Sequence, residues 1–251
     1  MRVVAVTNQK GGVGKTTTAV NMAAAFAATG RKTLLIDLDP QGNATTGSGI
    51  DKTEIPFSSY DLLTHNAPLA SCAHKTEGHY DLVAGNGDLT AAEIELLSTD
   101  NRQTQLKQAL DGNPYDIIVI DCPPSLNMLT VNALVAAQGI VIPVQCEFYA
   151  LEGLASLLET IEAVREGFNP TLEIDGVLRT MYDPRSALTA EVSRQIREYF
   201  KSKMFSTVIP RNVRLAEAPS HGQSVIHYDR RSRGAISYLA FAGEYFRKVA
   251  A

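Results

Sequence analysis

The chain has 251 residues and a net charge of −4, with 45% hydrophobic and 20% charged residues. This composition excludes a disordered or fibrous chain and is ordinary for a globular protein with a substantial buried core. No apolar run approaches the roughly 18 residues of a membrane span, no basic leader with a cleavage site is visible, and the three cysteines lack metal-type spacing, so we expect free thiols in a reducing cytoplasm.

Short apolar, β-branched runs alternate with longer segments of helical period along the chain. The predicted strands cover residues 2–7, 33–37, 80–84, 115–121, 139–144, 174–181 and 207–209. The predicted helices cover residues 15–29, 89–97, 102–110, 126–136, 151–166, 188–199 and 234–249. This alternation predicts an α/β fold with one mostly parallel, twisted sheet and helices on both faces. Because no linker, repeat or low-complexity tract interrupts it, we expect a single domain over residues 1–251.

The first predicted strand leads into a glycine-rich stretch, NQKGGVGKTTT, at residues 8–18. Its glycines permit a backbone path on which successive N–H groups point inward at phosphate oxygens, and the helix that follows adds the partial positive charge of its N-terminus. We expect Lys15 to reach the β- and γ-phosphates and the Thr16 hydroxyl to ligate Mg²⁺. The predicted nucleotide-binding residues of this phosphate loop are Gly11, Gly12, Val13, Gly14, Lys15, Thr16 and Thr17.

Two predicted strands end in carboxylates. Asp37 and Asp39 follow the strand residues at 33–36, and Asp121 follows those at 117–120, before a stiff Pro-Pro turn. Ligands of such sheets bind beyond the carboxyl ends of the strands, where an aspartate like Asp121 is suited to hold Mg²⁺ through a water. Asp39 lies past its strand end on a turn, where it is placed to orient or activate an attacking water. Asp37 remains open between a metal-supporting and a capping carboxylate.

Lys10 departs from the ordinary pattern G-x-x-x-x-G-K-[ST], whose first position is held by Gln9. The stretch KGGVGKTT at residues 10–17 resembles the deviant phosphate loop (deviant Walker A type) of the ParA/MinD family of P-loop ATPases. In that family the extra lysine reaches across a nucleotide-sandwich dimer to the partner's phosphates. Such a cation stabilises developing charge and couples hydrolysis to dimerisation. The resemblance therefore implies that Lys10 also binds nucleotide, in trans.

The segments DLDPQGNAT at residues 37–45 and DCPPSL at residues 121–126 resemble the two switch segments of the same family. By this resemblance the hydrolytic residue is Asp39, while Asp37 supports the outer shell of the metal. The implied catalytic residues are Lys10, Lys15 and Asp39, and the implied metal-binding residues are Thr16, Asp39 and Asp121.

The resemblance covers essentially the whole chain, with residues 51–110 the least distinctive. VQCEFYALEGL at residues 144–154 and VIPRNVRLAEAPS at residues 208–220 are similar to the chromosomal ParA branch, also called Soj. The resemblance implies a single ParA-type domain and adenine contacts from Pro210 and Arg211. Many plasmid partition ATPases carry an N-terminal helix-turn-helix domain, but so few residues precede Gly11 here that we expect no such extension. It implies a slow, Mg²⁺-dependent ATPase for DNA partitioning, cytoplasmic and nucleoid-associated. Its implied partners are a second copy on ATP binding, double-stranded DNA bound without sequence preference, and a ParB-type centromere-binding protein that stimulates hydrolysis.

Charge is divided unevenly along the chain. Residues 1–178 hold 10 Lys or Arg against 21 Asp or Glu, whereas residues 179–233 hold 11 against 5. A basic face suits a polyanion, although a solvated helix face would need no ligand. No helix carries Asn, Gln or Arg at base-reading spacing, so we expect contact with DNA phosphates alone. The predicted DNA-binding residues are Arg185, Arg214, Lys201, Lys203, Arg230, Arg231 and Arg233; further basic candidates are Arg179, Arg194, Arg197 and Arg211.

Two other classes of protein stay open at this point. A metabolic P-loop enzyme, such as an ATP-dependent ligase of the dethiobiotin synthetase type, would use the same fold on a small acid, but no region beyond the nucleotide loops offers converging groups for a second substrate. A MinD-like switch would end in a basic amphipathic helix that binds membrane. Here the last predicted helix spaces Ile236, Leu239 and Phe246 for one packed face and has only two basic residues, which favours core packing. We therefore expect no membrane partner.

Overall fold

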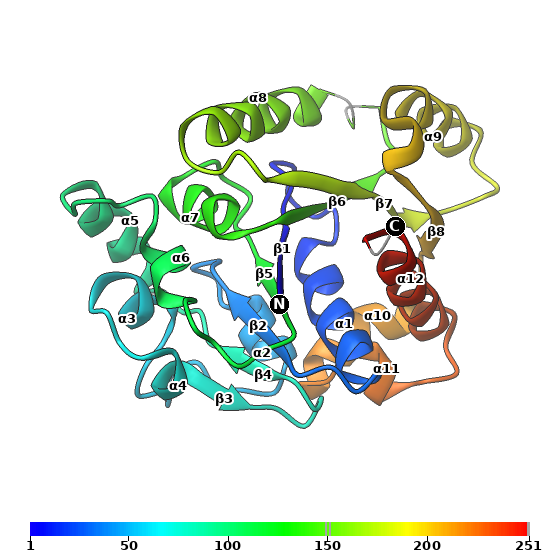
Figure 1. Ribbon diagram of the computed structural model, residues 1–251. Coiled ribbons are helices and arrows are strands. Elements are labelled where there is room, and N and C mark those ends of the chain that lie inside the picture. Colours follow the sequence, from blue (N-terminus) through cyan, green and yellow to red (C-terminus); the bar gives the residue numbers. More distant parts are fainter. Residues whose placement is uncertain (149, 151, 250–251) are drawn as a thin grey trace.

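One eight-stranded sheet forms the centre of the fold, in the order β3-β4-β2-β5-β1-β6-β7-β8 (Figure 1). The computed structural model describes residues 1–148, 150 and 152–249. Its strands are β1 (Arg2–Val6), β2 (Thr33–Asp37), β3 (Ala73–Lys75), β4 (Asp81–Val83), β5 (Ile117–Asp121), β6 (Gly139–Gln145), β7 (Glu173–Tyr182) and β8 (Met204–Pro210). Every neighbouring pair is parallel except β3 and β4, which are antiparallel at one edge.

The helices connect these strands. They are α1 (Lys15–Ala27), α2 (Asn43–Gly47), α3 (Ser59–Thr64), α4 (Leu69–Cys72), α5 (Leu89–Leu97), α6 (Gln105–Ala109), α7 (Met128–Ala136), α8 (Glu152–Gly167), α9 (Ala187–Phe200), α10 (Val213–Glu217), α11 (Val225–Tyr228) and α12 (Arg233–Val249). Two short 3₁₀ turns, η1 (Lys201–Lys203) and η2 (Ala218–His221), precede β8 and follow α10.

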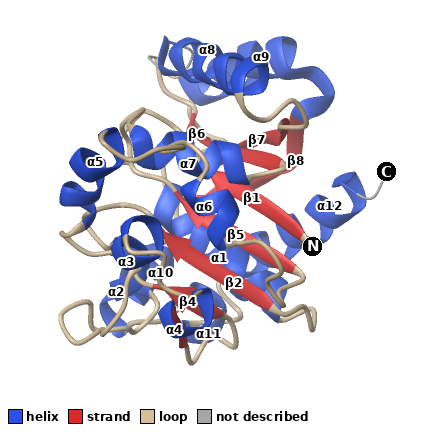
Figure 2. Cartoon of the chain, turned by 60° about the vertical axis from the view of Figure 1, so that its left-hand side comes forward, coloured by secondary structure: helices blue, strands red, loops and turns tan. Residues whose placement is uncertain are grey.

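Helices cover both faces of the sheet (Figure 2). One core lies between the sheet and helices α3 to α9, with Leu62, Leu129 and Leu157 among its fully buried members. The other lies between the sheet and α1, α2, α11 and α12, with Met22 and Tyr238 among its members. A parallel sheet buried on both faces requires strands that are apolar throughout, which explains runs such as IIVI before Asp121.

The predicted α/β class, the parallel sheet and all seven predicted strands are confirmed. The prediction missed the edge strand β3, which has three residues, and the helices α2, α3, α4, α10 and α11, which have four to six. Segments this short carry too little periodicity to be recognised. The helix predicted at 126–136 begins at Met128, because the Asn127 side chain caps it by accepting a hydrogen bond from Thr130 N at 3.1 Å.

Two predicted segments extend beyond the described residues. Tyr149 and Leu151 of the VQCEFYALEGL stretch lie outside them, as does the first residue of the helix predicted at 151–166. Among the described residues, no helix is long and apolar enough to cross a membrane.

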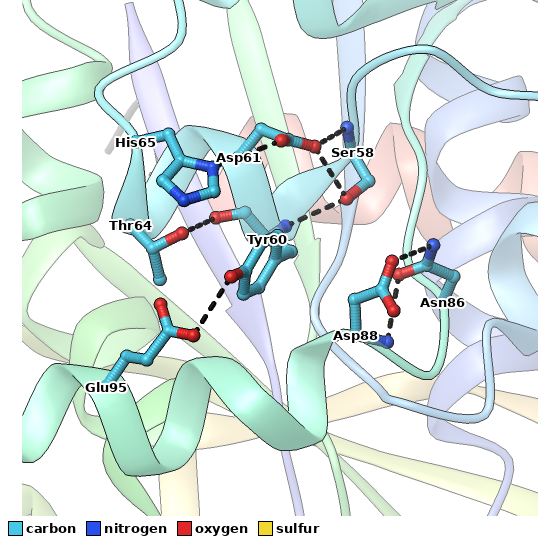
Figure 3. A network of polar contacts seen from close by, with 8 residues as sticks. All are labelled: Ser58, Tyr60, Asp61, Thr64, His65, Asn86, Asp88 and Glu95. Atoms are coloured by element: carbon cyan, nitrogen blue, oxygen red, sulfur yellow. Dashed lines mark hydrogen bonds and ion pairs between the residues drawn. The ribbon is translucent and has the colours of Figure 1, made fainter.

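A network of polar contacts surrounds the start of α3 (Figure 3). Ser58 and Asp61 form a capping box, in which the Ser58 side chain accepts from the first turn and Asp61 accepts from Ser58 N at 2.8 Å. The Tyr60 hydroxyl donates to Glu95 of α5 at 2.9 Å. Next to the cap, Ser59 Oγ donates to the carbonyl oxygen of Asp37 at 2.7 Å. Residues 51–110, the least distinctive part of the sequence, thus help to hold the end of β2, which is followed by the turn with Asp39 and carries Asp37.

The last helix packs against the first. Thr18 of α1 and Tyr238 of α12 are both buried, and their hydroxyl oxygens are 3.1 Å apart. The ring of Phe26 in α1 packs at a tilt against those of Tyr245 and Phe246 in α12, with centroids 5.3 and 4.6 Å apart.

The C-terminal helix packs into the core, as predicted, but the face predicted from Ile236, Leu239 and Phe246 is wrong. Ile236 is 56% exposed and the other two are only partly buried. The buried face of α12 is formed by Ala235, Tyr238, Phe241, Ala242 and Tyr245.

Tyr238→Phe should lower the free energy of unfolding by about 1 kcal/mol, because it removes one buried hydrogen bond and leaves the Thr18 hydroxyl without that partner. Urea unfolding followed by circular dichroism measures the change. In a Thr18→Val background the same substitution should cost clearly less, since no hydroxyl is then left behind. Equal costs in the two backgrounds would show that the two hydroxyls do not interact.

Candidate nucleotide site

The predicted phosphate loop joins β1 to α1 as a left-handed turn. Gly12 and Gly14 have φ of 72° and 86°, a region that residues with a side chain rarely adopt. Gly14, at the N-cap position of α1, has no side chain with which to cap the helix, so within the described residues the first turn lacks the usual side-chain cap. Thr180 of β7 donates its hydroxyl to the carbonyl of Val13 at 2.7 Å and so fixes the loop to the sheet. The loop therefore has the backbone conformation of an anion-binding site at a helix N-terminus.

Lys15 begins α1 with its side chain almost wholly buried. Its Nζ donates to the carbonyl oxygen of Lys10 at 3.2 Å. Burial lowers the pKa of Lys15, while the nearby Asp121, Cys122 and Asp39 act in the opposite direction. A buried ammonium beside the loop glycines is placed to bind phosphate oxygens, as predicted from the motif.

Asp37 and Asp121 are register partners at the carboxyl ends of β2 and β5, and both are fully buried. Asp37 accepts hydrogen bonds from Thr45 N and Oγ1, each at 2.8 Å, and from Asp39 N at 3.1 Å. Burial nevertheless raises the pKa of Asp37 to about 6. Because both of its oxygens are engaged, the geometry favours the capping interpretation over a metal-supporting one: Asp37 holds the turn that leads into α2.

Asp121 differs from Asp37 in its hydrogen bonding. Both of its oxygens are buried, and neither accepts a hydrogen bond of normal geometry from a described residue. Burial and the neighbouring Asp37 raise the pKa of Asp121 well above its usual range, and Thr16 and Lys15 act against this rise. A buried carboxylate without a donor costs free energy unless a cation or water pairs with it. Asp121 therefore fits Mg²⁺ or its water shell.

The protein offers few ligands for a metal at this site. No three His, Cys, Asp or Glu side chains converge as metal ligands within the described part of the chain. Mg²⁺ commonly keeps several waters and takes one or two carboxylates together with substrate phosphates. The residues present, Thr16 and Asp121, fit that mode, in which Mg²⁺ would neutralise charge on the phosphates.

Asp39 lies on the turn after β2. Its Oδ1 accepts a hydrogen bond from Gln41 N at 3.0 Å, and its carbonyl accepts from Gly42 N at 2.8 Å. Gly42 has φ of 61° and starts α2. Asp39 is also close enough to raise the pKa of Lys15 and Asp121. The structure thus brings Asp39, Lys15 and Asp121 into one electrostatic cluster, although whether Asp39 activates water stays a prediction.

Lys10 points to a different partner from the one expected of a phosphate-binding lysine. Its Nζ lies 3.0 Å from Oε2 of Glu147, which follows β6. The two side chains are 31% and 46% exposed. Exposed ion pairs of this kind contribute only about 0–1 kcal/mol, so Lys10 is held weakly. Glu147 was not among the predicted site residues, because nothing in the local pattern of either residue indicates a contact across 137 positions.

A cavity of about 350 Å³ opens beside the phosphate loop. Its wall includes the predicted adenine contacts Pro210 and Arg211. The sequence indicated the stretch at residues 208–220 as typical of the family branch, but it gave nucleotide contacts only to Pro210 and Arg211 there, and it did not indicate the lining residues of β7 and α12. The lining is Gly14, Thr17, Thr180, Met181, Ile209, Pro210, Arg211, Asn212, Val213, Leu215, Ala216 and Tyr238. A mostly apolar cavity next to a phosphate-binding turn suits a nucleoside.

The predicted basic surface divides into two parts. Arg185 follows β7 at the carboxyl edge of the sheet, and its side chain is 88% exposed. Arg214 of α10 is 49% exposed and pairs with Glu217 and Asp229. The contact with Asp229, and the packing of Leu215 against Gly234, bring α10 next to the exposed Arg230, Arg231 and Arg233.

Lys201 and Lys203 lie elsewhere. They precede β8, and Lys203 lines a pocket with Arg2 and Asp175 at the amino edge of the sheet. A strand of seven residues spans roughly 20 Å, so these lysines do not form one surface with Arg185 and Arg214 in a single chain. The prediction that Arg179 is a candidate for DNA contact is also wrong. Its side chain is buried and donates to Ser193 Oγ and to the carbonyls of Phe205 and Ser206. It cannot contact DNA from there.

Comparisons with known proteins agree with this geometry. A family model described as AAA domain matches residues 1–174. The sporulation initiation inhibitor protein Soj of Bacillus subtilis is 51% identical over 246 residues, covering 97% of each chain. The chromosome partitioning protein ParA of Myxococcus xanthus is 48% identical over 250 residues, covering 98% of this chain and 88% of that protein. Among solved structures, cobyrinic acid a,c-diamide synthase from Mycobacterium smegmatis with bound ADP and magnesium is 37% identical, with a TM-score of 0.88 over 100% of this chain and 96% of that one.

Asp39→Ala should leave ATP binding intact while hydrolysis falls by roughly 100-fold or more, the usual contribution of a general base. Asp39→Asn should lose hydrolysis equally, because it keeps an acceptor for Gln41 N but not the basic carboxylate. Lys15→Ala is the contrasting variant, in which ATP affinity itself should fall about 100-fold with the loss of a charge-assisted contact. Phosphate release and nucleotide binding are measured side by side; a wild-type rate in Asp39→Asn would move water activation to another residue.

Proposed function

The chain belongs to the ParA/Soj family of chromosome-partitioning ATPases, and we propose that its ATP-bound form dimerises across the phosphate loops, binds DNA without sequence preference and releases it after hydrolysis. The cofactors are ATP and Mg²⁺, held by the phosphate loop and Asp121. A ParB-type partner bound at a centromere stimulates an otherwise slow turnover. The protein thereby works as a switch on the nucleoid whose state is set by the nucleotide.

The observation that carries this proposal is the position of Lys10. Lys15 already supplies a buried ammonium at the phosphate loop, whereas the Lys10 ammonium is bound by Glu147 at the rim. A cation that is not needed in cis, and is held by a weak ion pair, is available to the phosphates of a second copy. Supplying it in trans joins the stabilisation of developing charge to dimer formation.

The proposed DNA-binding surface lies at the same end of the sheet as the phosphate loop. Arg185 follows the carboxyl end of β7 and Arg214 follows that of β8, at the end of the sheet that carries the phosphate loop. The exposed arginines at 230, 231 and 233 lie next to α10. A dimer across the loops brings both copies of this surface beside the shared interface. Doubling the cations in one surface favours a polyanion strongly. We assign no DNA contact to Lys201 and Lys203, which lie at the opposite edge.

A metabolic role is the alternative, since one similar structure carries the name of a biosynthetic enzyme. The partition role is favoured because the identity to that protein, 37%, is lower than the 48% and 51% shared with the ParA and Soj proteins. The two roles differ in one observable. DNA should change the sedimentation of the ATP-bound protein in the first case and leave it unchanged in the second.

Lys10→Ala should bind ATP as a monomer with normal affinity but lose the ATP-dependent dimer, because only the contact in trans is removed. Sedimentation velocity with ATP and with ADP measures this. Glu147→Gln is the matched variant: it frees Lys10 from its partner in cis and should strengthen the dimer or leave it unchanged. A dimer of normal stability in Lys10→Ala would reduce Lys10 to a loop charge.

Arg185→Ala and Arg214→Ala should weaken DNA binding by the ATP-bound protein to a similar degree on any duplex sequence. With about 4–6 phosphates neutralised per dimer, log K should fall with log salt at a slope of about −4 to −5, and each variant should lower that slope by roughly 2. Fluorescence anisotropy on two unrelated duplexes across a salt series measures both effects.

Lys201→Ala is the control for this experiment, since it removes one exposed cation at the other edge of the sheet and should leave the slope unchanged. Nucleotide affinity should be unaffected in all three variants. Binding that is independent of salt, or that requires one DNA sequence, contradicts a surface of phosphate contacts.

A further inference from the structure

Asn8 is a buried residue at the point where the chain leaves the sheet after β1 and enters the phosphate loop. Its side-chain amide forms hydrogen bonds in two directions. Nδ2 donates to the carbonyl oxygen of Pro143 in β6 at 2.7 Å, and Oδ1 accepts from Lys10 N at 3.0 Å. The two ends of the amide cannot be exchanged, because the Lys10 N–H can only donate and the Pro143 carbonyl can only accept. One buried side chain thus joins the loop to the strand beside it.

The pairing of β1 with β6 explains the contact of Nδ2. The two strands pair as far as Val6 and Val141, and Thr7 N donates to the Val141 carbonyl at 3.2 Å. Backbone groups along a strand alternate between its two neighbours, so the next carbonyl of β6 on this side belongs to Pro143. The Asn8 side chain binds that carbonyl in place of a backbone N–H. The main chain is therefore free to turn away from the sheet while it stays attached to β6.

The backbone of Lys10 is held on both sides. Its N–H is bound by Asn8, and its carbonyl accepts from Lys15 Nζ at 3.2 Å. A lysine ammonium has three donors, so this contact leaves Lys15 with donors for phosphate oxygens. An asparagine that accepts from the N–H two residues further on forms an Asx turn, which fixes the course of the backbone. Asn8 therefore sets the direction in which the Lys10 side chain leaves the loop, whereas the Lys10 ammonium is held by the exposed contact with Glu147.

We propose that Asn8 is a positioning residue for Lys10, which fixes the loop backbone so that the Lys10 ammonium is directed at the phosphates of a second copy. A long side chain loses rotamer freedom when an interface immobilises it, and a mobile backbone beneath it would add to that cost. A residue that already fixes this backbone in the monomer favours the dimer. The inference rests on the proposed ATP-dependent dimer, and it concerns a step that follows the binding of ATP.

The first test uses Asn8→Leu, which nearly keeps the volume of the side chain but forms neither hydrogen bond. Sedimentation velocity with Mg²⁺ and a non-hydrolysable ATP analogue measures the dimer, and displacement of a fluorescent ADP analogue from the monomer measures ATP affinity. The dimer should be weakened roughly tenfold, since a symmetric dimer contains the contact twice. ATP affinity should stay within about threefold of wild type, because the loop glycines and Lys15 are unchanged. An equal fall in ATP affinity would show general damage to the loop and overturn the proposal.

Two further variants separate positioning from stability. Asn8→Ser keeps an acceptor for the N–H two residues further on but is too short to reach Pro143, so it should retain most of the dimer stability. Asn132→Leu is the matched control, because Asn132 is also buried and accepts from Leu106 N at 3.2 Å while it donates to the Arg102 carbonyl at 2.7 Å. It should lower the melting temperature without weakening the dimer. Asn8→Leu must weaken the dimer more than either of these variants, and an equal loss overturns the proposal.

Thermal melting shows whether each variant is folded. If Asn8→Leu does not fold, Asn8→Ala takes its place with the same expected results, since it also removes both hydrogen bonds. A dimer of wild-type stability in the folded variant contradicts the role of Asn8 and leaves the proposed function intact. Absence of an ATP-dependent dimer in the wild-type chain instead contradicts the proposed function, and this inference with it.

Discussion

The rest of this structure depends on how the fold accommodates two buried carboxylates that lie side by side. Asp37 and Asp121 face each other across β2 and β5 with no exposure to solvent, and placing like charges together in a low-dielectric interior is costly. The fold offsets this cost differently for each. Asp37 is satisfied by Thr45 and by the backbone of the turn, which shapes the path of residues 39–45. Asp121 is left unsatisfied beside Lys15 and Thr16. We expect a bound cation with its phosphates to balance the charge that the protein alone leaves unpaired at Asp121.

Much of the fold could be predicted because its signals are local. The parallel sheet follows from apolar runs that are buried on both faces, and the phosphate loop follows from glycines between a strand and a helix. The positions of Asp39 and Asp121 at strand ends were visible for the same reason. The short elements were not visible, since α2 and α3 are held in place by tertiary contacts such as Thr45 with Asp37 and Ser59 with the β2 carbonyl.

What the sequence could not provide is the pairing of distant residues and the edge on which each residue lies. The ion pair of Lys10 with Glu147 joins two loops from different strands. Arg179 has the same charge as its neighbours in the basic segment, but its place in the middle of β7 buries it under α9. Lys201 and Lys203 are close to Arg185 in the sequence, yet a whole helix carries the chain from one edge of the sheet to the other between them. The number of charged residues in a segment of sequence does not show on which part of the folded surface those residues lie.

The packing of α12 on α1 has a consequence for the chain while it is being synthesised. The phosphate loop lies directly before α1, whereas Tyr238, which lines the adjacent cavity, belongs to α12, a helix of 17 residues more than 200 positions further along the chain. Domains tend to fold as units as the chain emerges from the ribosome. A nascent chain therefore presents its loop glycines and Lys15 early, yet the cavity beside them lacks Tyr238 until α12 has left the ribosome. Fragments without α12 would not form this cavity completely.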